Sequence, residues 1–188
     1  CGLNTWLGDL AEVRDKSEFT SEPVAYLNRM QLPTDAKVLF VGEAQIFDAR
    51  VPLVYNTVFD ISIFEQWCSA NEPGVPVADQ KMKSTDEIRE RLKSEGITHI
   101  LVNWQEILRY RTTYGISEFL APWRFEHLQR EGILHRNVTS LSGPRPMDSF
   151  SDSDRQLIKN WASELLIRYE SEPAFVTSQL FFVTAESE

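Results

Sequence analysis

The stretch that decides the fold is KVLFVGEAQIFD, residues 37–48. It opens with the apolar run 38–41 and turns polar directly after Gly42. A short apolar run that stops at a glycine is typical of a strand buried on both faces of a sheet. We therefore expect the polar residues after Gly42 to emerge at the carboxyl end of a central strand.

A second segment repeats this pattern. Residues 97–102 form an apolar run that ends at Asn103. The preceding residues 84–87, STDE, fit a capping box that starts a helix, and Gly96 supplies a left-handed helix end. We expect the two apolar runs to lie side by side and parallel, so that Gly42 and Asn103 emerge together.

The rest of the chain alternates in the same way. Helices are predicted at 21–31, 61–69, 84–95, 104–114, 117–131 and 151–169, further strands at 51–55, 133–135 and 175–184, and loops at 71–82 and 141–150. Strands that alternate with helices indicate a three-layer α/β domain with a mainly parallel, Rossmann-like sheet. Residues 175–184 are expected to form an antiparallel edge strand. Residues 21–188 would make one domain, preceded by an acidic approach segment, 1–20.

Composition excludes some classes of function. The chain has 188 residues and a formal net charge of -9, and its basic residues are interleaved with acidic ones, which argues against a nucleic-acid partner. No apolar run approaches the ~18 residues of a membrane span. The two cysteines, Cys1 and Cys68, have no metal-ligand spacing. A first residue other than Met suggests a fragment or a processed chain.

No complete catalytic, cofactor or metal motif is present. Gly42 stands alone and is followed by an acid, whereas a phosphate-binding loop needs several glycines or a lysine at fixed spacing. The histidines His99, His127 and His135 do not form a ligand pattern. Cys68 falls on the apolar side of a predicted helix, where a core role is usual. We therefore predict no catalytic residue, no cofactor and no metal.

The candidate binding residues follow the two central strands. In an open parallel sheet, ligands bind beyond the carboxyl ends of the strands, where the winding changes direction. Glu43, Gln45, Asp48 and Asn103 would line such a crevice. The alternative is that Glu43 and Gln45 cap loop amides and that Asp48 is solvated.

A second group is aromatic and basic. It comprises Trp104, Arg109, Tyr110, Arg111, Tyr114, Trp123, Arg124 and Phe125. Such side chains either form a surface for sugars or lipid headgroups, or pack in the interior.

The segments LPTDAKVLFVGEA (32–44) and LKSEGITHILVN (92–103), with the Trp/Tyr/Arg-rich helix that follows, carry a family resemblance. Across residues 21–134 the chain resembles the soluble C-terminal, extracytoplasmic domain of bacterial integral-membrane glycosyltransferases of the dolichyl-phosphate-mannose-mannosyltransferase-like type. In that family the acidic catalytic residue lies between early membrane spans, and no position here matches it.

The resemblance implies a noncatalytic accessory domain that helps to bind or position the acceptor at the membrane surface. Its partners would be the membrane-spanning part of the same parent chain and a glycan or lipid-linked sugar. Its location would be periplasmic, tethered to the membrane. The alternative is a free-standing α/β protein, cytoplasmic in that case, that binds a small ligand or a partner in the Gly42/Asn103 crevice.

Overall fold

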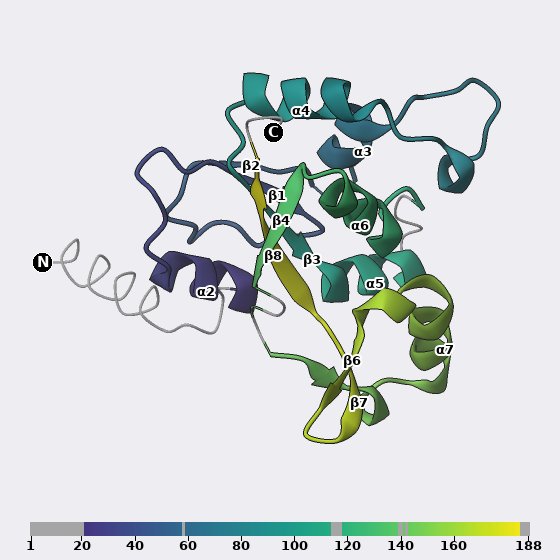
Figure 1. Ribbon diagram of the computed structural model, residues 1–188. Helices are drawn as coiled ribbons and strands as arrows, with labels where there is room; N and C mark the ends of the chain where they lie inside the picture. Colours follow the sequence, from purple (N-terminus) through teal and green to yellow (C-terminus); the bar gives the residue numbers. More distant parts are fainter. Residues whose placement is uncertain (1–20, 58, 114–117, 139–140, 142, 185–188) are drawn as a thin grey trace, which may run out of the picture.

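The computed structural model describes residues 21–57, 59–113, 118–138, 141 and 143–184 (Figure 1). The predicted approach segment, 1–20, lies outside this range. Within it, no helix combines the length and the apolar composition needed to cross a bilayer.

A mixed five-stranded sheet in the order β2-β1-β3-β8-β4 forms the centre. Its strands are β1 Val38–Val41, β2 Leu53–Val54, β3 His99–Asn103, β4 Leu134–Val138 and β8 Ser178–Val183. β1 pairs in parallel with both β2 and β3, and Val41 lies opposite Val102. The prediction that Gly42 and Asn103 emerge together is therefore confirmed. β2 is shorter than the predicted strand 51–55.

The last strand does not lie at an edge. β8 runs antiparallel between β3 and β4, so the predicted antiparallel direction is confirmed and the predicted edge position of 175–184 is wrong. The residues explain the placement, because β8 is buried over Ser178–Phe181 whereas His135 and Arg136 of β4 are exposed. Charged and polar side chains suit an edge, and an apolar strand suits the interior. Residues 175–184 also divide between two strands.

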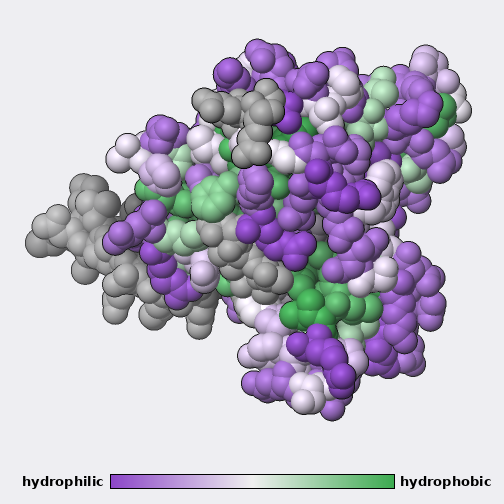
Figure 2. Space-filling model, viewed as in Figure 1, coloured by the Kyte–Doolittle hydropathy of each residue, from purple (hydrophilic) through white to green (hydrophobic). Residues whose placement is uncertain are grey.

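Both faces of the sheet are covered. Along β1, Leu39 and Val41 enter a larger core, and Val38 and Phe40 enter a smaller core on the opposite face. The larger core takes its apolar residues from α3 Ile63–Cys68, α4 Thr85–Ser94, α5 Trp104–Thr113, α6 Pro122–Arg130 and α7 Asp152–Trp161. The smaller core is closed by α2 Glu22–Arg29 and the β1–β2 connection. The face shown in Figure 2 is mostly hydrophilic.

The start of α4 confirms the predicted capping box. The Glu87 amide donates to Ser84 Oγ at 3.4 Å, and the Ser84 amide and hydroxyl donate to the Glu87 carboxylate at 3.1 and 2.6 Å. These bonds from Ser84 favour the ionised carboxylate and lower the pKa of Glu87.

The predicted helix 151–169 is only partly formed. α7 ends at Trp161, and the chain continues through a 3-10 turn, Ser163–Leu165, into strand β6 Leu166–Tyr169. β6 forms a hairpin with β7 Glu172–Phe175, and β5 Arg145–Pro146 completes a three-stranded antiparallel sheet. Strand pairing thus overrides the helical periodicity of the sequence.

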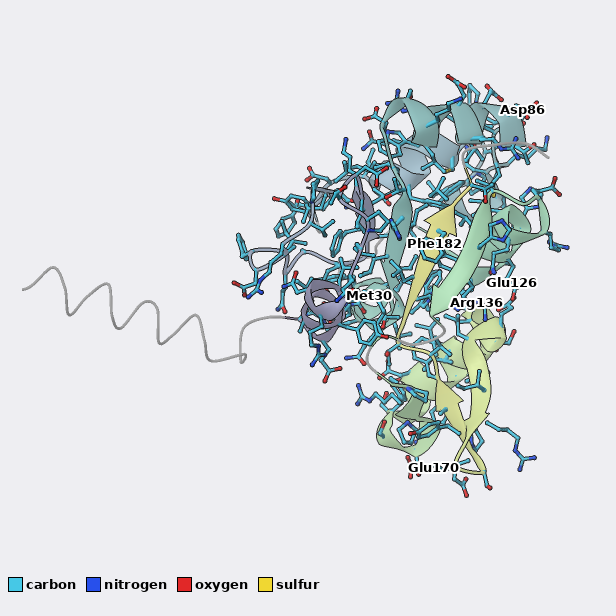
Figure 3. The ribbon with its side chains drawn as sticks, turned by 60° about the vertical axis from the view of Figure 1, so that its left-hand side comes forward. Met30, Asp86, Glu126, Arg136, Glu170 and Phe182 are labelled. Atoms are coloured by element: carbon cyan, nitrogen blue, oxygen red, sulfur yellow. The ribbon has the colours of Figure 1, made fainter. Side chains whose placement is uncertain are left out.

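The tip of this hairpin has an unusual backbone. Its two-residue turn places Glu170 at φ 50° and Ser171 at φ 74°, in the left-handed region that Asn and Gly prefer in such turns. Figure 3 shows Glu170 at the end of the hairpin, far from Asp86 of α4.

Three other predicted segments are revised. Helix 117–131 begins only at Pro122, and the loop 141–150 contains β5 and a 3-10 turn, Met147–Ser149. The predicted loop 71–82 is braced from within, because the buried Gln80 side chain accepts a hydrogen bond from the Glu72 amide and donates to the carbonyls of Glu72 and Val75. Apolar periodicity alone could not reveal these local bonds.

Gly42 fixes the distance between the strand ends and α5. Its φ is +76°, and an added Cβ would clash with the Ile107 side chain and lie 2.9 Å from the Asn103 carbonyl oxygen. We expect Gly42→Ala to lower the free energy of unfolding by about 2 to 4 kcal/mol, from backbone strain and overpacking together. Urea denaturation measures this loss. Gly74→Ala, at φ +78° with open space around the new Cβ, is the matched control. Equal losses in both variants would contradict the packing argument.

His99 makes stability depend on pH. Its ring is buried against Phe182, Nδ1 lies 2.7 Å from Thr98 Oγ1, and Nε2 has no hydrogen-bond partner in the part of the chain that the structure describes. Desolvation lowers the pKa of His99 from its usual 6.5, partly opposed by Asp35.

Below pH 6.5 the unfolded chain therefore binds a proton at His99 that the folded chain resists, so acidification destabilises the fold. We expect the unfolding free energy to fall by up to ~1.4 kcal/mol per pH unit in this window. His99→Gln should flatten that slope, whereas the exposed His135→Gln should not. Urea denaturation at several pH values in this range measures the slope. Identical slopes in both variants would disprove the assignment of the pH dependence to His99.

Candidate functional site

Four segments meet at the carboxyl end of β1 and β3 and enclose a hollow of about 190 Å³. Its lining residues are Ser21, Glu22 and Pro23 at the start of α2, Glu43 and Gln45 after β1, Asn103, Gln105 and Glu106 at the junction of β3 and α5, and Thr177 before β8. Residues far apart in the sequence thus come together at one edge of the sheet.

The strand order explains why a hollow forms here. The chain leaves β1 for β2 on one side and then returns past β1 to β3 on the other. The two connections lie on opposite faces, since the loop after β1 packs in the smaller core and α3 and α4 pack in the larger core. Connections that depart to opposite faces leave a crevice between the strand ends.

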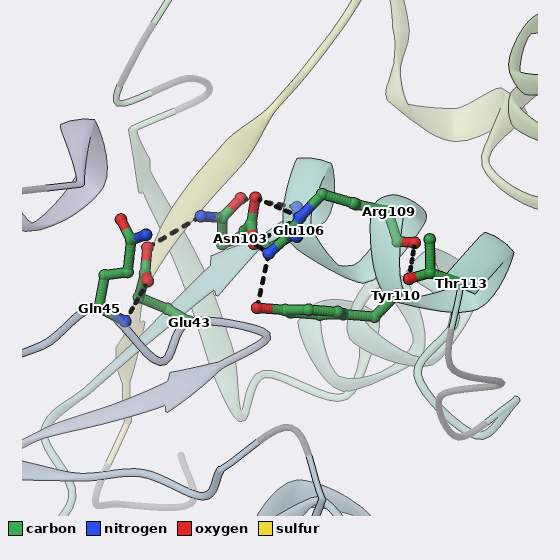
Figure 4. A network of polar contacts seen from close by, with 7 residues as sticks. All are labelled: Glu43, Gln45, Asn103, Glu106, Arg109, Tyr110 and Thr113. Carbon is green, nitrogen blue, oxygen red and sulfur yellow. Dashed lines mark hydrogen bonds and ion pairs between the residues drawn. The ribbon is translucent and has the colours of Figure 1, made fainter.

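A buried hydrogen-bonded pair forms the floor. Glu43 and Asn103 are 3% and 5% exposed, and Asn103 Nδ2 donates to Glu43 Oε2 at 2.9 Å. The Gln45 amide donates to Glu43 Oε1 at 2.7 Å (Figure 4). Each carboxylate oxygen therefore has a neutral donor from the chain, and each keeps a further lone pair for another donor.

Asn103 also starts α5. Its Oδ1 accepts the Glu106 amide at 3.1 Å, so one side chain links the end of β1 to the first turn of the helix. Glu106 in turn forms an ion pair with Arg109, whose Nε donates to Glu106 Oε2 at 3.0 Å. Arg109 Nη2 donates to the Tyr110 hydroxyl at 2.8 Å. Burial, followed by the nearby Glu106 carboxylate, raises the pKa of Tyr110.

The lining is acidic and rich in acceptors. It contains the carboxylates of Glu22, Glu43 and Glu106, and none of the lining residues that the structure describes is Lys, Arg or His. Arg109 lies next to the hollow as the partner of Glu106. Such a surface suits ligands that donate hydrogen bonds, and it repels phosphates and carboxylates.

Of the predicted site residues, the structure brings Glu43, Gln45 and Asn103 together. Asp48 is exposed, and it does not line the hollow; its backbone carbonyl accepts the Asn28 side-chain amide at 2.7 Å. The predicted alternative also holds in part, because Glu43 does cap a loop amide while it lines the hollow.

Sequence reasoning missed Ser21, Glu22, Glu106 and Thr177. The pattern Asn103-Trp104-Gln105-Glu106 has the spacing of a helix start and could have indicated Glu106. Thr177 reaches the site because β8 lies antiparallel beside β3, and no local pattern reveals that pairing.

The aromatic and basic group does not form one surface. Trp104, Arg124 and Phe125 are fully buried, and Trp104 Nε1 donates to the Gln179 side chain at 2.9 Å. Trp123 is 45% exposed, and Tyr114 lies outside the described residues. Interior packing, the predicted alternative, accounts for these buried members.

Two further groups bear on chemistry. Burial raises the pKa of Cys68 to about 12, so this thiol is not a ready nucleophile. No cluster of three or more His, Cys, Asp or Glu side chains suited to a metal ion occurs in the described ranges.

The Glu43–Asn103 pair can be tested by exchanging donor and acceptor. Asn103→Asp keeps the oxygen that caps Glu106 but places a second carboxylate against Glu43. We expect it to lower the free energy of unfolding by about 2 kcal/mol, because a buried donor is lost. The double variant Glu43→Gln/Asn103→Asp restores one donor facing one acceptor and should recover at least half of the loss. Urea denaturation of all four proteins measures the coupling, and strict additivity would contradict it.

Comparisons of the chain with protein-family models, with curated proteins and with solved structures found no match.

Proposed function

We propose that this domain is a noncatalytic module of a membrane glycosyltransferase and that it binds hydroxyl groups of the acceptor in the hollow beside Glu43. The hydrogen bond between Asn103 and the buried Glu43 is the observation that carries the proposal. It holds a carboxylate in a fixed position at the point where an open α/β sheet binds ligands.

The resemblance supports the same site. Its two characteristic segments, 32–44 and 92–103, contain β1 and β3, and they contribute Glu43 and Asn103. The parts of the sequence on which the resemblance rests are thus the parts that build the hollow.

The chemistry of the lining supports a hydroxyl-rich ligand. Sugar hydroxyls donate to carboxylates and to amide or hydroxyl oxygens, and Glu43, Glu106, Gln45 and Thr177 provide such oxygens. The acidic lining disfavours a phosphate group at this position. In the proposed arrangement the hollow holds a sugar hydroxyl face, while the lipid-linked part of the substrate and the reaction itself belong to the membrane portion of the parent chain.

The binding proposal predicts where free sugars contact the domain. Titration with D-glucose, D-galactose and D-mannose should shift the amide NMR signals of Gln45 and Glu106 and the side-chain amide of Asn103. Gln45→Ala removes an exposed acceptor from the lining. It should lower the affinity for the most tightly bound of these sugars about 5-fold, because one hydrogen bond contributes about 1 kcal/mol.

The matched control is Gln156→Ala, an exposed glutamine of α7 that is not part of the lining. It should leave the affinity unchanged. Sugar-dependent shifts elsewhere, or none at the three named residues, would contradict the binding proposal. The attachment to a membrane-spanning part is tested separately, by the gene sequence that precedes Cys1. Several apolar spans encoded there would support the attachment, and a start codon directly before Cys1 would exclude it.

A further inference from the structure

Glu43 is a buried carboxylate without a basic partner among the described residues. It is 3% exposed, it forms no ion pair in the described part of the chain, and its hydrogen-bond partners are the neutral amides of Asn103 and Gln45. An ionised carboxylate taken out of water is costly unless a cation or several donors compensate it. Two neutral donors leave the charge itself uncompensated.

The basic side chain drawn beside the site in Figure 4, Arg109, is already engaged. Arg109 is paired with Glu106 and donates to the Tyr110 hydroxyl. Glu22, which also lines the hollow, adds another carboxylate that is exposed and has no ion pair in the described ranges. The negative charge of the lining therefore exceeds the positive charge beside it.

An unpartnered polar atom also belongs to the lining. The Ser21 hydroxyl oxygen is buried and has no hydrogen-bond partner among the described residues, although Ser21 precedes α2 at the position where a serine normally caps the helix. A buried hydroxyl without a partner has a cost, and rotation of the Ser21 side chain toward a polar ligand in the hollow would remove it. Glu43 lacks a counter-charge, which a positively charged ligand would supply.

We propose that the ligand of this hollow carries a protonated primary amine beside its hydroxyl groups, as an amino sugar does, and that the ammonium group binds Glu43. This inference rests on the proposed function, because it specifies the ligand of the same site. An ammonium group has three donors. Its N–H groups can donate to the free lone pairs of the Glu43 oxygens, and the hydroxyls beside it can donate to the Glu106 carboxylate.

The lining favours an ammonium group over a bare metal ion. Divalent ions need several oxygen or nitrogen ligands in close array, and the described residues contain no such cluster. A primary amine on a sugar needs one carboxylate and a space of a few atoms, which a hollow of about 190 Å³ provides.

Three related sugars test the inference on the unmodified protein. D-glucosamine, N-acetyl-D-glucosamine and D-glucose share the ring. In a buffer at about pH 6 only glucosamine is charged, because its free amine is protonated there. NMR titration should give an affinity for glucosamine at least ~10-fold above that for glucose, which equals ~1.4 kcal/mol. Added NaCl should weaken glucosamine binding more than glucose binding, because salt screens the charge pair.

A variant assigns the effect to one carboxylate. Glu43→Gln should reduce the preference for glucosamine to about 1-fold, since the counter-charge is gone. Glu172→Gln, on the hairpin, changes the net charge equally but lies outside the hollow, and it should keep the preference. An amide spectrum of Glu43→Gln shows whether the variant is folded, and the wild-type comparison stands without it.

The outcomes separate this inference from the proposed function. The NMR signals of Gln45, Asn103 and Glu106 report the affinity of each sugar for the hollow. Equal affinities for glucosamine and glucose would overturn the ammonium inference and leave the sugar-binding proposal standing. A glucosamine preference that survives in folded Glu43→Gln would overturn the assignment to Glu43. If none of the three sugars shifts the pocket signals, both proposals fail.

Discussion

The parallel pairing of β1 with β3 is the interaction on which the rest of the structure depends. It places Val41 opposite Val102, so the chain leaves both strands at the same level. Gly42 then lets α5 approach until Ile107 and the Asn103 carbonyl fill the space that a side chain would need. The buried link between Glu43 and Asn103 follows from this close approach, and so does the hollow above it.

Much of this arrangement could be predicted from the sequence, because the signals are local. The apolar run before Gly42 and the run before Asn103 identify two buried strands, and the capping box at Ser84 identifies the helix between them. Parallel pairing follows from a helical connection, since such a connection brings the chain back to the same end of the sheet. Three of the four predicted site residues accordingly lie together.

The remaining features depend on contacts between distant residues. Leu166–Tyr169 continues a helical pattern but pairs with Glu172–Phe175, and this pairing decides its conformation. Thr177 reaches the hollow through the antiparallel pairing of β8, and Ser21 and Glu22 reach it through the packing of α2 on the smaller core. Asp48 was expected by proximity in sequence to Glu43, but the intervening turn directs the chain toward Asn28.

The insertion of β8 between β3 and β4 has a consequence for synthesis on the ribosome. Until residues 178–183 have left the exit tunnel, β3 and β4 are not joined, and each has an open edge with unpaired backbone groups. Open edges of this kind are templates for pairing with other nascent chains. The strand that emerges last of the five therefore covers these two edges when it pairs with β3 and β4.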